Sequence, residues 1–251
     1  MSAINGNETA LRTAVVTGAA GGVGGALVRT LAASGAWHVI AVARKQADVD
    51  ELNAIDHVEA HLLDLLDADA LEKWGAGIAE REASNGGVDL LANVAAVAVV
   101  GSVEETKNAD WDVTLRTNVV APAVLSRSLL PALRVAHGSV VFVNSGAGER
   151  PIVNHSVYVS SKHALRGFAG SLRLEESVDG IRVATVYPGQ IATKMLRGID
   201  ERLGVEFNGE DYIQPQTVAD TIIWIANAGP DVHITNIDLR PRQEVSAKFN
   251  V

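Results

Sequence analysis

A short apolar run, a glycine-rich turn and a helical stretch near the N-terminus place the strongest constraint on the fold. Residues 13–17 are apolar and end at Gly18, as is typical of a buried strand. Gly22 and Gly24 follow, and the helical pattern runs over residues 26–34. The glycines let the backbone turn tightly and approach a pyrophosphate, while the amides and positive dipole end of the helix face the anion. The stretch predicts a phosphate-binding turn; the alternative is an ordinary turn that happens to contain glycines.

Apolar runs and helical patterns alternate along the rest of the chain. The further predicted strands are residues 37–43, 57–63, 88–94, 138–145, 180–187 and 233–239. The further predicted helices are residues 67–83, 110–136, 156–177 and 217–227, and Pro131 is a predicted local break in the second of them. This alternation predicts an α/β fold, in which helices cover both faces of a doubly wound parallel sheet of about seven strands.

No linker or internal repeat divides the chain, so residues 1–251 are predicted to form a single domain. Residues 1–11 are polar and are predicted to be a flexible N-terminus. Residues 195–214 are charged, contain glycine and show no clear periodicity. They are predicted to lie on the substrate side of the domain, and the alternative is a simple surface excursion.

Composition narrows the class of protein. Hydrophobic residues make up 47% of the chain but aromatic residues only 4%, so a core of Ala, Val, Leu and Ile is expected, as in a buried parallel sheet. A net charge of -9 without a basic block argues against nucleic acid or an anionic membrane as a partner. The absence of cysteine excludes disulfides and thiolate chemistry, and the scattered histidines predict no metal site. No apolar run approaches about 20 residues and no signal-peptide pattern is present, which predicts a cytoplasmic protein.

The residues after the second predicted strand bear on the type of dinucleotide. An acidic residue at this place would bond the ribose 2′-hydroxyl of NAD, but the chain has Ala43 followed by Arg44 and Lys45. A guanidinium binds a 2′-phosphate that a carboxylate would repel. NADP(H) is therefore the preferred cofactor, with Arg44 as its main contact, and NAD(H) is the alternative. Arg44 and Lys45 can also be read as solvated charges.

Tyr158 and Lys162 lie four residues apart in a predicted helix and so on one helical face. An ammonium beside a phenol is expected to lower the tyrosine pKa from about 10 and to make it a usable proton donor and acceptor. Ser145 ends a predicted strand, where open α/β sheets bind ligands. Asn118 lies in an apolar helical stretch, where its amide needs partners. It is predicted either to bond nearby backbone or to hold a water or a catalytic group.

From about Thr13 to Pro241, these separated motifs resemble the short-chain dehydrogenases/reductases. The matching residues are Thr17, Gly18, Gly22 and Gly24 in the glycine turn, Asp64 after the third strand, Asn118, Ser145, Tyr158 and Lys162, and the group Pro188, Gly189 and Thr193. The resemblance implies a Rossmann-like fold and hydride transfer between a nicotinamide and a secondary alcohol or ketone. It further implies that Tyr158 is the general acid/base, that Lys162 bonds the nicotinamide ribose, that Ser145 bonds the substrate oxygen, and that Asn118 holds a water.

The resemblance also implies a set of cofactor contacts. They are Gly18, Gly22, Val23, Gly24, Arg44, Asp64, Leu65, Asn93, Tyr158, Lys162, Pro188, Gly189, Ile191 and Thr193. The chain departs from the family at Asn93-Val94-Ala95-Ala96, where Asn-Asn-Ala-Gly is common. Ala96 in place of glycine is expected to resist positive φ and to narrow the backbone's approach to the cofactor.

Residues 234–241 resemble the ending of an NADP-preferring subgroup, some of whose members oxidise 3-hydroxy acids or serine-like substrates. A 3-hydroxy acid is therefore a candidate substrate, with Arg150, His155 and Arg197 as carboxylate partners or, alternatively, as surface charges. The resemblance implies a homotetramer or homodimer built on the helices 110–136 and 156–177. The alternatives are an NAD-dependent dehydrogenase of similar chemistry and a non-catalytic NADP-binding sensor. A third alternative is an epimerase or dehydratase that acts on a sugar nucleotide, although relatives of that kind usually have longer chains with a larger C-terminal substrate domain.

Overall fold

Alternate residues along the apolar strands pack into two separate cores, one on each face of a parallel sheet. In β1 (Arg12–Thr17), Ala14 and Val16 join one core and Val15 joins the other. This two-sided burial explains why the strands are nearly continuous apolar runs rather than alternating ones. The computed structural model of the protein describes residues 11–243. Residues 1–10 of the predicted flexible N-terminus lie outside this range, so that prediction is not tested.

All strands of the described chain belong to one seven-stranded sheet in the order β3-β2-β1-β4-β5-β6-β7, and every pairing is parallel. The other strands are β2 (Trp37–Ala43), β3 (Val58–Leu62), β4 (Leu90–Asn93), β5 (Ser139–Val143), β6 (Arg182–Pro188) and β7 (Asn236–Leu239). The predicted doubly wound parallel sheet is confirmed. Its strand order reverses between β1 and β4, which is where such sheets form a ligand crevice.

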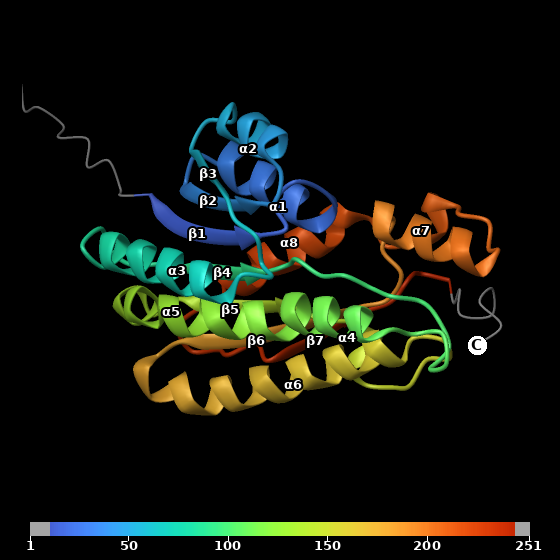
Figure 1. Cartoon of the computed structure of the whole chain (residues 1–251). Coiled ribbons are helices and arrows are strands. Elements are labelled where there is room, and N and C mark those ends of the chain that lie inside the picture. The colour runs from blue at the N-terminus through green and yellow to red at the C-terminus, as the bar shows by residue number, and fades with distance from the viewer. Residues whose placement is uncertain (1–10, 244–251) are drawn as a thin grey trace, which may run out of the picture.

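Helices cover both faces of the sheet (Figure 1). The α-helices are α1 (Gly22–Ala33), α2 (Gln46–Asn53), α3 (Ala68–Ala83), α4 (Asn108–Leu115), α5 (Ala121–Ala136), α6 (Ser156–Glu176), α7 (Lys194–Leu203) and α8 (Pro215–Ala226). Short 3-10 turns are η2 (Gly146–Gly148), η3 (Ser177–Asp179) and η4 (Gly209–Asp211), and η1 (Arg116–Val120) is a π-helical turn. Helices α1, α2 and α8 pack into one core and α3, α5 and α6 into the other.

The long predicted helix of residues 110–136 is interrupted, but not where the sequence predicts. Pro131 lies inside α5 without ending it, so the predicted break there is wrong. The irregularity is instead the π turn η1, which contains the buried Asn118. A π turn adds a residue to the helix and often marks a functional position. The first helix also begins earlier than predicted, at Gly22 instead of Ala26.

The combined segment Asn108–Ala136 is long and apolar enough to cross a membrane by length and composition. In the structure it is part of the helical layer, next to α3 and α6. Leu125, Leu129 and Leu133 have no exposed surface and belong to the cores on that side of the sheet. Packing within this fold thus accounts for part of its apolar composition, since 39% of the apolar window is buried.

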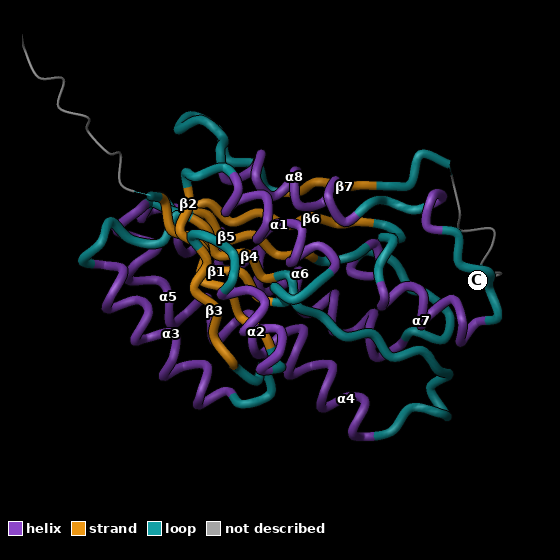
Figure 2. The backbone as a smooth tube through the Cα atoms, turned by 90° about the horizontal axis from the view of Figure 1, so that it is seen from above, coloured by secondary structure: helices purple, strands orange, loops and turns teal. Residues whose placement is uncertain are grey.

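Helix α7 is set apart from the two helical layers, as Figure 1 and Figure 2 both show. The absence of periodicity predicted for residues 195–214 is wrong, because Leu196, Ile199 and Leu203 recur at helical spacing on one side of α7. Charged residues between them hide the pattern. Leu196 also packs with Tyr212 in a small cluster separate from the main cores.

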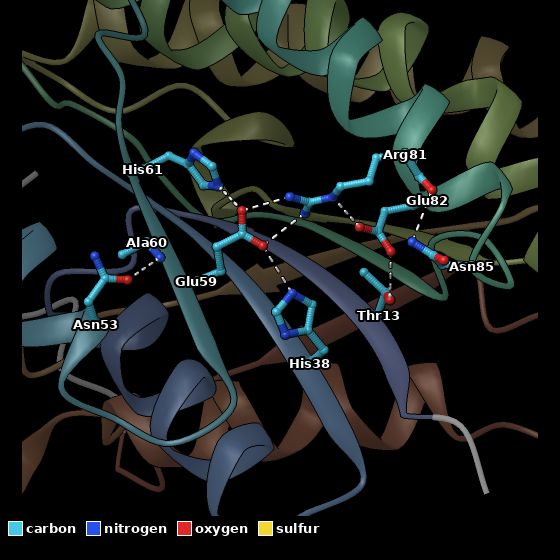
Figure 3. Close-up of polar contacts among 9 residues, drawn as sticks. All are labelled: Thr13, His38, Asn53, Glu59, Ala60, His61, Arg81, Glu82 and Asn85. Carbon is cyan, nitrogen blue, oxygen red and sulfur yellow. Dashed lines mark hydrogen bonds and ion pairs between the residues drawn. The ribbon is translucent and has the colours of Figure 1, made fainter.

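A charged network ties the edge strand β3 to its neighbours (Figure 3). The Glu59 carboxylate accepts two hydrogen bonds from Arg81 of α3, at 2.7 and 2.9 Å. It also accepts bonds from His38 of β2 at 3.2 Å and from His61 at 2.8 Å. Partial burial raises the pKa of Glu59, but the Arg81 bonds and charge, together with the two histidine bonds, outweigh burial and lower the pKa to about 2. The network therefore holds Glu59 ionised and fixes β3 against β2 and α3.

Gly24→Ala tests the close packing at the start of α1. A Cβ at Gly24 would lie 2.2 Å from the Gly18 carbonyl oxygen, and this backbone atom has little room to move. We expect the free energy of unfolding to fall by about 2–3 kcal/mol in urea denaturation. Gly21→Ala is the matched control, because an added Cβ there meets nothing within 4 Å and φ is extended at -177°. Equal stability of the two variants would contradict the contact.

Candidate active site

A cavity of about 1330 Å³ lies at the carboxyl edge of the sheet. Its wall includes Arg44 and Asp64 at one end, the glycine turn after β1 in the middle, and Ser145 and Tyr158 at the other. Because all strands are parallel, the loops that follow β1 to β6 meet at this edge. The site is therefore assembled from segments that are far apart in the sequence.

The glycine turn is held against the end of β4. Gly18 has a φ of +68°, and a Cβ there would lie 3.0 Å from Cα of Ala95, so only glycine fits. The Thr17 hydroxyl accepts hydrogen bonds from the amides of Val94 at 3.0 Å and Ala95 at 3.2 Å. Ala96 is not among the described non-glycine residues with positive φ. Ala96 therefore has a negative φ in the structure, and the strain expected of an alanine at positive φ does not arise.

The N-terminus of α1 opens into the middle of the cavity. Gly21, Gly22 and Val23 line the wall, and a Cβ at Gly22 would lie 3.3 Å from the Thr193 methyl group after β6. The first turn of a helix leaves backbone amides without intrahelical acceptors, which suits an anion. Glycines without side chains and a helix N-terminus form a cradle that fits the pyrophosphate of a dinucleotide. Gly21, Gly22, Val23 and Thr193 would border it.

The end of the cavity beside β2 and β3 carries both signs of charge. Arg44 and Lys45 are exposed on its rim after β2, and Asp48 in the first turn of α2 joins them. Asp64 is fixed by a hydrogen bond from the Leu66 amide to its carboxylate, at 3.0 Å. Cations are thus available where a 2′-phosphate would lie. Asp48 is a feature of this rim that the sequence pattern does not single out.

Tyr158 and Lys162 lie in the first turns of α6, as predicted, but their electrostatics differ from the prediction. Burial raises the pKa of Tyr158 to about 12, and a hydrogen bond from Ser145 opposes the rise only in part. Burial also lowers the pKa of Lys162 to about 7. The Lys162 Nζ lies 5.7 Å from the centre of the Tyr158 ring and donates to the Val143 carbonyl at 2.9 Å. The predicted lowering of the tyrosine pKa is wrong here, because burial removes charge from the lysine and stabilises the neutral phenol.

Asn118 is fully buried and bonded to backbone, which is the first of its two predicted roles. Its amide oxygen accepts from the Val97 amide at 2.9 Å, and its Nδ2 donates to the Val97 carbonyl at 2.8 Å. Nδ2 also donates to the Ser161 hydroxyl at 3.0 Å, and Ser161 donates to the Tyr158 carbonyl at 2.7 Å. Asn118 therefore connects the loop after β4 to the helix that carries Tyr158.

Most of the predicted site residues line the one cavity. These are Gly18, Gly22, Val23, Arg44, Asp64, Leu65, Ser145, Tyr158, Lys162, Pro188, Gly189, Ile191 and Thr193. Gly24, Asn93 and Asn118 are not part of its wall. Gly24 packs on the Gly18 carbonyl, and the buried Asn93 side chain has no hydrogen-bond partner among the described residues. These three residues shape the site from behind the wall.

Asn144 is a buried residue of the site that the sequence analysis does not single out. Its Nδ2 donates to the Lys162 carbonyl at 3.1 Å, and its amide oxygen lies 2.5 Å from where a Cβ on Gly148 would be. It fixes α6 against the loop that carries Ser145. The only sequence signal is its position directly before Ser145 at the end of a predicted strand.

The candidate carboxylate partners separate into two groups. Arg150 and His155 line the cavity on the Tyr158 side. Arg197 does not line it; its guanidinium stacks on the Phe207 ring at 4.2 Å. The cation–π contact keeps Arg197 on the outer side of α7, so its predicted carboxylate role has no support from the geometry.

A doubly wound parallel sheet with a dinucleotide cradle and a Tyr-Lys pair beside it defines a nicotinamide-dependent oxidoreductase. The family model for short chain dehydrogenase matches residues 12–204, and the chain belongs to this family. It is an oxidoreductase that acts on CH-OH groups with NAD(P).

Relatives of known activity cover most of the chain. L-xylulose reductase of Mesocricetus auratus is 40% identical over 191 residues, which are 74% of this chain and 74% of the relative. Serine 3-dehydrogenase of Agrobacterium fabrum is 29% identical and covers 95% of this chain and 97% of its own. Among solved structures, the closed form of serine dehydrogenase complexed with NADP+ has a TM-score of 0.83 at 25% identity, covering 95% of this chain and 98% of that one.

Lys162→Met tests the cost of burying the lysine. The folded-state pKa is about 7 against an ordinary 10.5, so the unfolded chain binds more protons between these values. The stability contributed at this position therefore rises with pH across that window, by up to about 1.4 kcal/mol per pH unit. We expect the stability of the parent to rise relative to Lys162→Met from pH 7 to pH 10. The exposed Lys107→Met is the control, and parallel curves for parent and Lys162→Met would contradict the assignment.

Proposed function

We propose that the protein uses NADP(H) to interconvert a secondary alcohol that carries a carboxylate, such as a 3-hydroxy acid, with its ketone. One observation carries the substrate part. Among the described residues, the cavity wall on the Tyr158 side contains Arg150 and His155 but no Asp or Glu; the only acidic wall residues, Asp48 and Asp64, lie at the far end. A wall that carries an arginine and no carboxylate near the reacting group favours an anionic substrate.

Two relatives support this substrate class by name. Serine 3-dehydrogenase and the trans-4-hydroxycyclohexanecarboxylate dehydrogenase of Sinomonas cyclohexanicum, which is 28% identical over 88% of this chain, both act on alcohols that bear a carboxylate. L-xylulose reductase, by contrast, takes a neutral sugar. A sugar ketone is therefore the rival substrate class.

In the proposed mechanism, bound nicotinamide supplies or accepts the hydride. Tyr158, whose pKa of about 12 keeps it protonated, donates its proton to the carbonyl oxygen during reduction and accepts it back during oxidation. Ser145 donates a hydrogen bond to the same oxygen and stabilises its developing charge. Lys162 has a pKa of about 7 and so gains or loses its positive charge near neutral pH. When it is charged, it lowers the pKa of the neighbouring Tyr158.

Tyr158→Phe and a substrate panel test this function together. The panel contains 3-hydroxy acids, L-xylulose and bulky hydrophobic ketones, each followed by NADPH fluorescence. We expect the highest kcat/KM with a 3-hydroxy acid and its ketone, and a loss of about 10²-fold or more in kcat for Tyr158→Phe with NADPH binding retained. Near-normal turnover by Tyr158→Phe would refute its proposed role, and a preference for L-xylulose would refute the carboxylate proposal.

The preference for NADP(H) rests on Arg44 and Lys45 at the rim and on the missing acidic residue after β2. Solved relatives bound to NADP support it, among them a metagenomic short-chain oxidoreductase in complex with NADP, with a TM-score of 0.75 and 29% identity over 93% of this chain. Asp48 on the same rim is compatible with NADP only if it turns away from the phosphate or is paired with a cation.

Arg44→Ala measures this preference. We expect KM for NADPH to rise about tenfold, equivalent to about 1.4 kcal/mol, while KM for NADH changes little, because only NADPH carries the 2′-phosphate. Arg127→Ala is the control, since Arg127 pairs with Glu72 away from the cavity. A parent protein that prefers NADH would reverse the cofactor assignment.

Assembly into a dimer or tetramer and location in the cytoplasm stay predictions. The exposed Val135 of α5 and Leu174 of α6 lie on the helices named for assembly and are compatible with it. A segment on the substrate side is likewise proposed for residues 195–214, where Leu196, Ile199 and Leu203 border the cavity.

A further inference from the structure

Arg240, directly after the edge strand β7, reaches back across the ends of two neighbouring strands. Its Nη1 donates to the Tyr187 carbonyl of β6 at 3.0 Å and to the Leu239 carbonyl at 3.2 Å. Tyr187 lies immediately before Pro188 and Gly189, which border the cavity. The guanidinium thus contacts the backbone at the root of the turn after β6.

The same guanidinium faces the loop that carries Ser145. A Cβ added at Gly146 would lie 3.5 Å from both of its terminal nitrogens, so a larger residue at Gly146 would be in contact with the guanidinium. Its Nη2 forms an ion pair with the Glu149 carboxylate at 3.7 Å. The same nitrogen donates a hydrogen bond to the Asp238 carboxylate at 3.0 Å. One planar group therefore spans the loop after β5 and the turn after β6. A lysine ammonium has no rigid fork with which to make these contacts together.

We propose that Arg240 is a positioning residue that fixes Ser145 relative to the Pro188–Gly189 turn, and so sets the gap in which substrate and nicotinamide meet. The effect on turnover rests on the proposed function. The role is geometric because Asp238 and Glu149 balance the charge of Arg240. Pairing of β7 does not depend on the side chain, because the Gly189 amide bonds the Leu239 carbonyl at 2.8 Å through backbone alone.

The first readout is hydrogen exchange, which needs no substrate. Within the loop, the Ala147 amide bonds the Ser145 hydroxyl at 3.1 Å and the Gly148 amide bonds the Ser145 carbonyl at 2.9 Å. In Arg240→Met we expect these amides to exchange about fivefold faster or more, with the melting temperature nearly unchanged. Arg242→Met, the same change at an exposed arginine two residues on, is the control. Unchanged exchange in Arg240→Met overturns the proposal.

The second readout is a double-mutant cycle with Ser145→Ala, using the best carbonyl substrate of the panel. If Arg240 acts through Ser145, Arg240→Met lowers kcat about tenfold in the parent but less than about twofold in Ser145→Ala, and Arg240→Lys restores little. Equal losses in both backgrounds would show a role independent of Ser145 and overturn the proposal. Faster exchange without turnover of any substrate would instead count against the proposed function and leave the anchoring role standing.

Discussion

The parallel direction of all seven strands is the constraint on which the site depends. Because every strand runs the same way, the loops after β1 to β6 all emerge at one edge. A reversal of the strand order between β1 and β4 then leaves a crevice at this edge that no crossover helix fills. Gly18 packs against Ala95 at this reversal, so the backbone after β1 lies directly against the backbone after β4.

Burial at the Tyr158 end of the cavity costs stability but shifts the pKa values of two groups in opposite directions. Lys162 is one of the largest fully buried side chains, and among the described residues its ammonium donates a hydrogen bond only to the Val143 carbonyl. Keeping an ammonium there is costly, which is why its pKa falls to about 7 while that of Tyr158 rises. Two groups with opposite shifts in one apolar site are typical of acid/base centres. The protein thus gives up stability at the place where a titrating pair is useful.

The sequence predicts the fold class and most of the cavity wall because these follow from local patterns. Apolar runs ended by glycine or proline identify strands such as β1 and β6, and glycine spacing identifies the turn before α1. Interactions between distant segments are not readable in this way. The π turn at Asn118 is associated with bonds to Val97 and Ser161, and the shift of the Tyr158 pKa arises from packing. Helix α7 was not predicted because charged residues lie between its apolar residues in the sequence and hide their helical spacing.

Asn118, Asn144 and Arg240 have a common physical role in the loops around the cavity. Asn118 joins the loop after β4 to α6, and Asn144 joins the end of β5 to α6. Arg240 pairs with Glu149 of the loop after β5 and donates to the Tyr187 carbonyl at the end of β6. Each uses a side chain with several donors or acceptors to bond backbone that belongs to another segment. Loops at the end of a sheet are otherwise its most mobile parts. Placement of the Ser145 and Tyr158 hydroxyls to within the tolerance that hydride and proton transfer require therefore depends on side chains that donate hydrogen bonds to backbone.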